Sequence, residues 1–157
     1  VNGPAVGLGC SLALFCDFVY ATPRSKFADP HVSVGLVAGD GGCVIWPQLI
    51  GYARAKKYLL TGEMIKADDA LSMGLIAEVF EEDKIDQEVQ ALAEKLRDGA
   101  KYSIRWTKTS INAGLKVMAN SIIDRAAAFE NVTQLMEDHK IALEAFAKKE
   151  TPKFKQK

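Results

Sequence analysis

The stretch VNGPAVGLGCSLALFC, residues 1–16, places two glycines between a short β-prone segment and an apolar run. The first segment ends at Gly7 and Gly9, and glycine is the residue that most readily lets a chain turn sharply. Residues 10–16 are mostly apolar and meet Asp17, a pattern that favours a buried helix. The stretch therefore predicts a strand, a tight turn and a buried helix, the beginning of an α/β fold.

Further strands and helices are expected up to residue 80. The β-prone segments FVYAT, SKFAD and LIAEVF predict strands, whereas ARAKKYLLTG and KADDALSMG predict helices that end at glycines. Another helix is expected after the Gly41–Gly42 pair, with Pro47 near its start or at a kink. Between His31 and Gly42 the glycines disfavour long regular structure, so we expect a strand fragment and a loop.

Beyond residue 80 the sequence predicts only helices, with breaks at the two glycines Gly99 and Gly114. Apolar residues recur at helical spacing in successive stripes: Ile85, Val89, Leu92, Ala93 and Leu96; Ile104, Ile111, Leu115 and Met118; Ile122, Ala126, Phe129 and Met136; and Leu143, Phe146 and Ala147. We therefore expect residues 1–80 to form a mixed core and residues 81–157 a helical region. Such stripes need a partner surface, either the first half of the chain or another subunit.

Composition argues against several classes of function. The 20 basic and 20 acidic residues cancel, which gives no electrostatic case for nucleic acid or an acidic membrane surface. The longest apolar run, AVGLGCSLALFC, is shorter than the roughly 20 residues that a membrane-spanning helix needs. Three cysteines without a CxxC spacing predict free thiols, as in the cytoplasm. The only histidines, His31 and His139, are far apart in sequence, so no metal site is expected.

The Gly7–Gly9 turn is the first candidate site. Small residues let a ligand approach backbone N–H groups, and the start of a helix adds the positive end of its dipole. Such a turn can stabilise an oxygen that gains negative charge during a reaction. Ser11 follows on the helix and faces whatever the turn holds, although a serine without a neighbouring base is a poor nucleophile. The alternative is an ordinary turn with two glycines.

His31 and Asp40 form the second candidate, because a turn between them could bring the two side chains together. A carboxylate beside a histidine fixes its tautomer and raises its pKa, which makes a better base near neutral pH. The alternative is a buried histidine and an aspartate that caps the following helix. Trp46, one turn into that helix, is expected in the core, or as a flat wall for a substrate.

Several motifs in the expected order resemble the second half of the crotonase (enoyl-CoA hydratase/isomerase) superfamily. They are VNGPAVGLGCSLALFCDFVYAT, SKFADPHVSVGLVAGDGG, YARAKKYLLTGEMIKADDALSMGLIAEVF and EAFAKKETPKF. The resemblance implies part of a ββα spiral (residues 1–80) followed by a helical trimerisation region (residues 81–157), in a homotrimer or dimer of trimers. It also implies acyl-CoA substrates, with coenzyme A as part of the substrate and no permanently bound cofactor.

The resemblance also implies roles for individual residues. The backbone N–H of Leu8, between Gly7 and Gly9, corresponds to one of two donors that hold the thioester oxygen as an enolate. The substrate pocket would be lined by the Gly7–Gly9 turn, Ser11 and Trp46. Hydratases of the family use two glutamates, and those positions correspond to Ser11 and His31 here. Because serine cannot act as a carboxylate base, two-glutamate hydration is in doubt.

The spacing of His31 and Asp40 further resembles a branch of the superfamily that includes 6-oxocamphor hydrolase, in which a His–Asp pair activates water. Three functions therefore remain open. The first is an acyl-CoA hydratase or isomerase in which His31 is the base or positions water and Asp40 orients it. The second is a hydrolase that cleaves C–C bonds of cyclic β-diketones. The third is a non-catalytic assembly module.

The chain begins at Val1 within an expected strand, so we expect it to be a piece of a longer protein that is weakly active or inactive alone. Half of the oxyanion donors would be missing, and the edge where the first half packs would be exposed. Sedimentation velocity of the 157-residue chain should show association or aggregation. A single well-behaved monomer at all concentrations would contradict this expectation.

Overall fold

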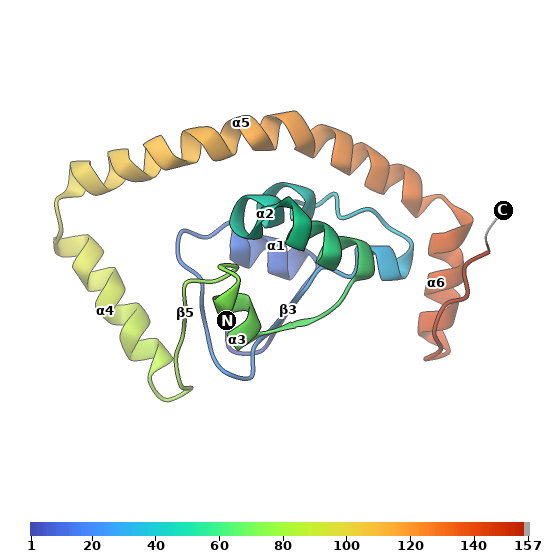
Figure 1. The fold of residues 1–157 in the computed structure, drawn as a ribbon, viewed down its shortest axis with the longest axis horizontal. Coiled ribbons are helices and arrows are strands. Elements are labelled where there is room, and N and C mark those ends of the chain that lie inside the picture. Colours follow the sequence, from blue (N-terminus) through green and yellow to red (C-terminus); the bar gives the residue numbers. More distant parts are fainter. Residues whose placement is uncertain (156–157) are drawn as a thin grey trace.

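The computed structural model describes residues 1–155 and places a small strand and helix core beneath a long helical arch (Figure 1). Strand β3 (Lys26–Ala28) is the centre of a three-stranded sheet. It pairs in parallel with β1 (Pro4–Val6) and antiparallel with β4 (Ile65–Lys66). A second sheet pairs β2 (Tyr20–Ala21) in parallel with β5 (Glu78–Val79). The predicted α/β fold class is confirmed.

Helix α1 (Leu8–Leu14) begins two residues earlier than the apolar run suggests. Gly7 makes this possible, because its φ of 55° turns the chain directly from β1 into the helix. The Gly7 N–H donates to the Ala28 carbonyl across the sheet (3.0 Å), which holds the turn against the end of β3. The amino end of α1 therefore lies beside the residues that follow β3.

The expected strand fragment after residue 31 is wrong, because His31–Val34 forms the 3₁₀ helix η1. Pro30 precedes it and Gly35, in the left-handed conformation, ends it. The Ser33 N–H donates to the Pro30 carbonyl (2.9 Å), and the Gly35 N–H donates to the Val32 carbonyl (3.2 Å). Proline fixes φ near the helical value, and glycine allows the left-handed stop, so a short tight helix forms.

Helix α2 (Gly42–Thr61) contains both helices that the sequence predicts as separate. The break lies at Gly51, with φ of 75° and ψ of 160°, rather than at Pro47. Helix α3 (Ala67–Ser72) follows β4 and ends before Gly74. The buried core includes the side chains of Phe27, Val44, Trp46, Ile65 and Leu75. The core therefore joins β3 and β4 to α2.

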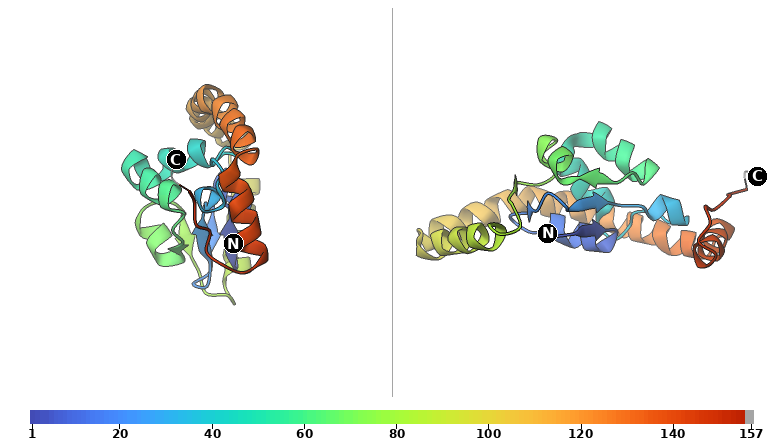
Figure 2. Two further views of the ribbon diagram at one scale, coloured as in Figure 1. Left: turned by 90° about the vertical axis from the view of Figure 1, so that its right-hand side faces the viewer. Right: turned by 90° about the horizontal axis from the view of Figure 1, so that it is seen from below.

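The helical region consists of α4 (Ile85–Asp98), α5 (Lys101–Gln134) and α6 (Glu137–Ala147). Two predicted stripes belong to one helix, so the expected break at Gly114 is wrong. An added Cβ at Gly114 would meet nothing within 4 Å. A single exposed glycine costs a helix only about 1 kcal/mol relative to alanine, which the rest of α5 overcomes. Figure 2 shows α5 passing along the whole length of the core.

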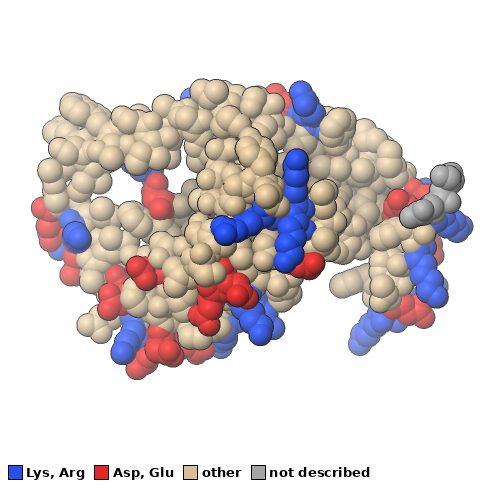
Figure 3. All heavy atoms as spheres, in the orientation of Figure 1, with Lys and Arg blue, Asp and Glu red and all other residues tan. Residues whose placement is uncertain are grey.

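Much of α5 presents apolar side chains to solvent, including Trp106, Ile111, Val117 and Phe129. The arch is mostly uncharged in Figure 3, whereas charged side chains gather over the lower part of the molecule and along α6. A hollow of about 660 Å³ between α1, α2 and α5 is lined mainly by apolar residues. The exposed stripes fit the expected partner surface, and the division at residue 80 stays a prediction. Within residues 1–155 no helix combines the length and apolarity needed to cross a membrane.

Helix α6 packs against η1 through close backbone contact. The Val34 carbonyl lies 2.7 Å from His139 Nδ1. An added Cβ at Gly35 would lie 2.8 Å from the backbone of Asp138 and His139. Only glycine therefore allows η1 and α6 to approach this closely.

We predict that Gly35→Ala destabilises the chain more than Gly74→Ala. Both glycines have positive φ (70° and 81°), so each substitution carries about 1 kcal/mol of backbone strain. At Gly74 a Cβ would meet only the Leu49 carbonyl oxygen, at 3.8 Å. Gly35→Ala should add roughly 1–3 kcal/mol of overpacking. Urea unfolding measures the difference, and equal losses for the two variants would contradict the packing described here.

Candidate active site

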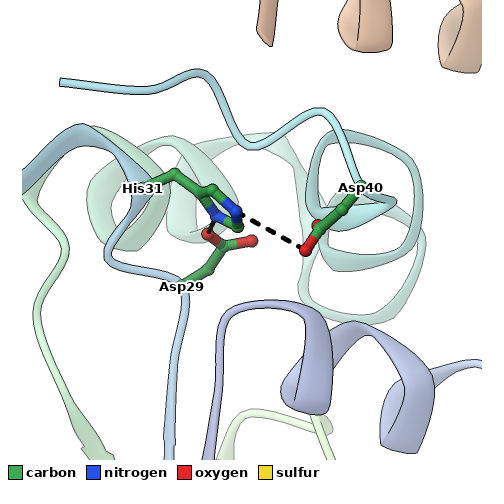
Figure 4. A group of neighbouring side chains, drawn as sticks. All are labelled: Asp29, His31 and Asp40. Atoms are coloured by element: carbon green, nitrogen blue, oxygen red, sulfur yellow. Dashed lines mark hydrogen bonds and ion pairs between the residues drawn. The ribbon is translucent and has the colours of Figure 1, made fainter. Parts of the chain in front are cut away.

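His31 is the centre of a cluster of acidic side chains (Figure 4). It is the first residue of η1, three residues after β3, and its side chain is 12% exposed. Its Nδ1 faces Asp29 Oδ1 in a short contact. Its Nε2 faces the other side of the ring, 3.5 Å from Asp40 Oδ2. The structure therefore brings together the predicted pair, His31 and Asp40, and adds Asp29.

Asp40 lies in the loop before α2, and the alternative that it caps this helix is wrong. The cap position is Gly41, and no side chain within residues 1–155 makes a capping hydrogen bond there. Instead the Ser11 Oγ–H of α1 donates to Asp40 Oδ1 (3.0 Å). Oδ2 is left to face His31. Ser11, which is buried, thus orients the carboxylate of Asp40.

Asp29 is a site residue that the sequence analysis missed. It directly follows β3, and its side chain has no exposed surface. An added Cβ at Gly42 would lie only 2.0 Å from Asp29 Oδ2, so the absence of a side chain at the start of α2 makes room for this carboxylate. The available signal was an aspartate two residues before the histidine, with a glycine pair later in the same segment.

Glu130 is the second missed residue, and it comes from α5. Its Oε1 lies 3.9 Å from His31 Nε2, and its side chain is 19% exposed. Gly39 allows α5 to come this close, because an added Cβ there would lie 2.5 Å from the Ala126 carbonyl oxygen and 2.6 Å from Glu130 Oε2. No local pattern marks Glu130, since its relation to His31 exists only in three dimensions.

The carboxylates raise the pKa of His31 above its ordinary value of 6.5. The largest cause is the hydrogen bond to Asp29, with smaller contributions from the charges of Asp40 and Glu130, while burial acts in the opposite direction. Burial also raises the pKa of the Cys10 thiol to about 12, and Asp29 adds to the effect. The pKa of Cys43 is raised for the same reasons. The thiols are therefore poor nucleophiles, and His31 is the group suited to proton exchange near neutral pH.

The Gly7–Gly9 turn borders this cluster. An added Cβ at Gly7 would lie 3.7 Å from His31 Cε1, so the turn and the imidazole ring are neighbours. Leu8 is the first residue of α1, and the N–H groups of a first helical turn have no acceptor within the helix. Its side chain is 55% exposed, and a Cβ at Gly9 would meet nothing within 4 Å. The backbone of the turn is thus open to an approaching group.

Trp46 is fully buried in the core cluster, which agrees with its expected place in the core. Its role as a wall for substrate stays a prediction.

Three side chains of this cluster carry donor atoms that could also bind a metal ion. Asp29, His31 and Asp40 each offer one atom within 4.8 Å of the others, a spacing at which an ion could be held. However, Asp29 Oδ1 already contacts His31 Nδ1, and Oδ2 packs against Gly42. A protonated His31 would supply the positive charge that the carboxylates favour. The arrangement fits a histidine used for proton exchange better than a cation site.

Comparison with known proteins places these features in a family. The whole chain, residues 1–157, matches the family model described as enoyl-CoA hydratase/isomerase. A short-chain-enoyl-CoA hydratase of Clostridioides difficile is 40% identical over 124 residues, which is 79% of each protein. A crotonyl-CoA hydratase of Syntrophomonas wolfei is 34% identical, and the match covers 98% of this chain and 59% of that protein.

Solved structures agree with this. A crystal structure of an enoyl-CoA hydratase from Mycobacterium avium subsp. paratuberculosis K-10 superposes with a TM-score of 0.94 at 29% identity, over 99% of this chain and 63% of that one. The structure of a carnitinyl-CoA hydratase from Mycobacterium avium superposes with a TM-score of 0.91 at 34% identity, and the match covers 99% of this chain and 60% of that one. The chain thus spans about 60% of the length of many of its relatives.

We predict that His31 titrates with a midpoint above 6.5 in the folded chain. Because its folded pKa is raised, its contribution to stability is fully present below pH 6.5 and is lost as pH rises through the folded pKa. Proton NMR of the imidazole Cε1–H measures the midpoint, and His139→Gln assigns the two histidine signals. A midpoint at or below 6.5 would contradict the cluster described here.

Proposed function

Since the chain belongs to the enoyl-CoA hydratase/isomerase family, we propose that it carries the acid–base part of an active site for acyl-CoA thioesters. The observation that supports this most directly is the position of His31, between carboxylates and next to the Gly7–Gly9 turn. A proton-exchanging group and an open turn of backbone N–H groups are what enolate chemistry requires.

His31 Nε2 is the proposed site of proton exchange. In hydration, neutral His31 removes a proton from water, the water oxygen bonds to the β-carbon of an enoyl thioester, and the double-bond electrons move to the thioester oxygen. The imidazolium then returns the proton to the α-carbon as the enolate collapses, so that one water is added overall. In isomerisation the same nitrogen removes a proton from one carbon and returns it to another.

Asp40 is proposed as the second acid–base or water-positioning group. The resemblance aligns the two glutamates of hydratases with Ser11 and His31, and serine cannot replace a carboxylate. Ser11 nevertheless donates a hydrogen bond to Asp40 (3.0 Å). A carboxylate is thereby held beside the position where the first glutamate is missing. This substitution supports hydration by a His31/Asp40 pair in place of two glutamates.

The Leu8 N–H is proposed as one donor to the enolate oxygen. Its place at the start of α1, beside an exposed glycine turn, supports this role. The partner donor and most contacts to coenzyme A would come from the part of the relatives that this chain does not span. Coenzyme A enters as part of the substrate, with no permanently bound cofactor.

Cleavage of cyclic β-diketones is less well supported, because the relatives compared are named as CoA hydratases. A non-catalytic role is less well supported too, because the candidate acid–base residues converge. The exposed apolar stripes of α5 support assembly into a homotrimer or a dimer of trimers. The three free cysteines support a reducing, cytoplasmic location.

The test joins this chain to the N-terminal segment of the Clostridium acetobutylicum short-chain-enoyl-CoA hydratase, which matches 95% of the chain at 35% identity. We predict turnover of enoyl-CoA thioesters, measured as loss of the conjugated double bond over a series of acyl lengths. His31→Gln should lower kcat by about 10²-fold to 10⁴-fold, the usual contribution of a general acid–base group.

His139→Gln is the matched control, because it changes the other histidine, which lies on α6 and whose Nδ1 is 2.7 Å from the Val34 carbonyl oxygen, and it should leave kcat nearly unchanged. If His31 is the base, kcat/KM should fall on the acidic side of its raised pKa. If the chimera neither turns over nor binds a CoA thioester of any acyl length, the proposed function is wrong. If the His31→Gln chimera and the unsubstituted chimera have the same kcat, His31 is not the acid–base group.

A further inference from the structure

We propose that Asp29 is the positioning residue of this site: it accepts a hydrogen bond from His31 Nδ1–H and leaves Nε2 as the nitrogen that exchanges protons. This inference rests on the proposed function and changes the role expected for Asp40. The sequence suggests Asp40 as the residue that orients the histidine. The geometry points to a different carboxylate, on the opposite side of the ring.

The carboxylates face different nitrogens of the His31 ring. Asp29 Oδ1 meets Nδ1 in the shortest contact of the cluster. Asp40 Oδ2 and Glu130 Oε1 both face Nε2, at 3.5 and 3.9 Å. A neutral imidazole carries one N–H, so it can donate at only one end. The closer acceptor favours the proton on Nδ1.

Burial separates the two ends of the ring. The Asp29 side chain has no exposed surface, whereas those of Asp40 and Glu130 are 14% and 19% exposed, although Asp40 Oδ2 itself is buried. The Nδ1 end of His31 therefore points into the protein, and the Nε2 end faces the two partly exposed side chains. Substrate and water approach a site from its exposed side, so Nε2 is the nitrogen better placed to exchange protons with them.

Asp29 is also held more firmly than Asp40. It directly follows β3, and Pro30 separates it from His31. Its Oδ2 packs against Gly42, the first residue of the 20-residue helix α2. The positive end of a helix dipole favours a negative charge there. Asp29 is thus fixed by strand, proline and helix end, whereas Asp40 lies in a loop and is held by the hydroxyl of Ser11.

Other titratable groups face the ring as well. Asp40 approaches from the loop before α2, Glu130 from α5, and the thiols Cys10 and Cys43 lie in α1 and α2 nearby. Asp40 and Glu130 favour a proton on Nε2 and therefore compete with Asp29. The tautomer of neutral His31 reports which carboxylate wins, and it can be measured without any turnover.

The deciding experiment is nitrogen-15 NMR of His31 in the unmodified chain, at a pH above its titration midpoint. We expect the Nδ1–H tautomer, with Nε2 unprotonated. The Nε2–H tautomer would make Asp40 or Glu130 the orienting group and would overturn the inference. This measurement needs no substrate, so it tests the role of Asp29 independently of the acyl-CoA function. Turnover and thioester binding test that function.

Substitution gives the second readout. Asp29→Asn should lower the titration midpoint of His31 more than Glu130→Gln does, because it removes a charge in direct contact with the ring. In the active chimera, kcat should fall about 10²-fold or more with KM within a few-fold, and the acidic limb of the pH profile should move to lower pH. A merely structural Asp29 would cost stability and leave the pH profile in place, which contradicts the proposal. If Asp29→Asn does not fold, the tautomer of the unmodified chain decides.

Discussion

The short contact between buried Asp29 and His31 is the constraint around which the rest of the site is arranged. A carboxylate without exposed surface needs a hydrogen-bond donor and a favourable field, because burying a charge without them is costly. His31 supplies the donor and the start of α2 supplies the field. Gly42 leaves room for the carboxylate, because an added Cβ there would lie 2.0 Å from Asp29 Oδ2. Gly7 acts differently: its positive φ turns the chain from β1 into α1 and brings the start of α1 beside the ring of His31.

The helical region takes part in the site, although the sequence suggests that it serves assembly. Gly39 lets α5 pack so closely that Glu130 reaches the open side of His31. Gly35 lets α6 pack on η1, the element that begins with His31. Movement of α5 or α6 would therefore change the surroundings of the imidazole. Assembly through the exposed stripes of α5 could in this way affect the acid–base group.

The elements of the fold and the site residues that depend on local sequence patterns could be predicted from the sequence. The strand, turn and helix of residues 1–16 and the α/β fold class follow from local motifs. The spacing of His31 and Asp40 left their pairing open, and the family resemblance favoured it. Asp29 was not predicted, because an aspartate directly before a proline is also typical of an ordinary turn, and the sequence alone does not show that its side chain is buried. Glu130 could not be predicted, because its approach depends on the packing of α5 over Gly39. The helix break expected at Gly114 does not occur, because the low helix propensity of one glycine is outweighed by the cooperativity of the long helix α5.

The charge arrangement limits which reaction the site can support. Three carboxylates surround one imidazole, so an anion that formed among them would be strongly disfavoured. An enolate is stable here only if its oxygen lies away from the carboxylates, at the backbone N–H groups of the Gly7–Gly9 turn, while the reacting carbon faces Nε2. His31 lies beside that turn, so one molecule of the proposed thioester substrate would meet both requirements. The same carboxylates stabilise the imidazolium that forms when Nε2 takes a proton, so the negative charge that excludes an anion assists the proton transfer.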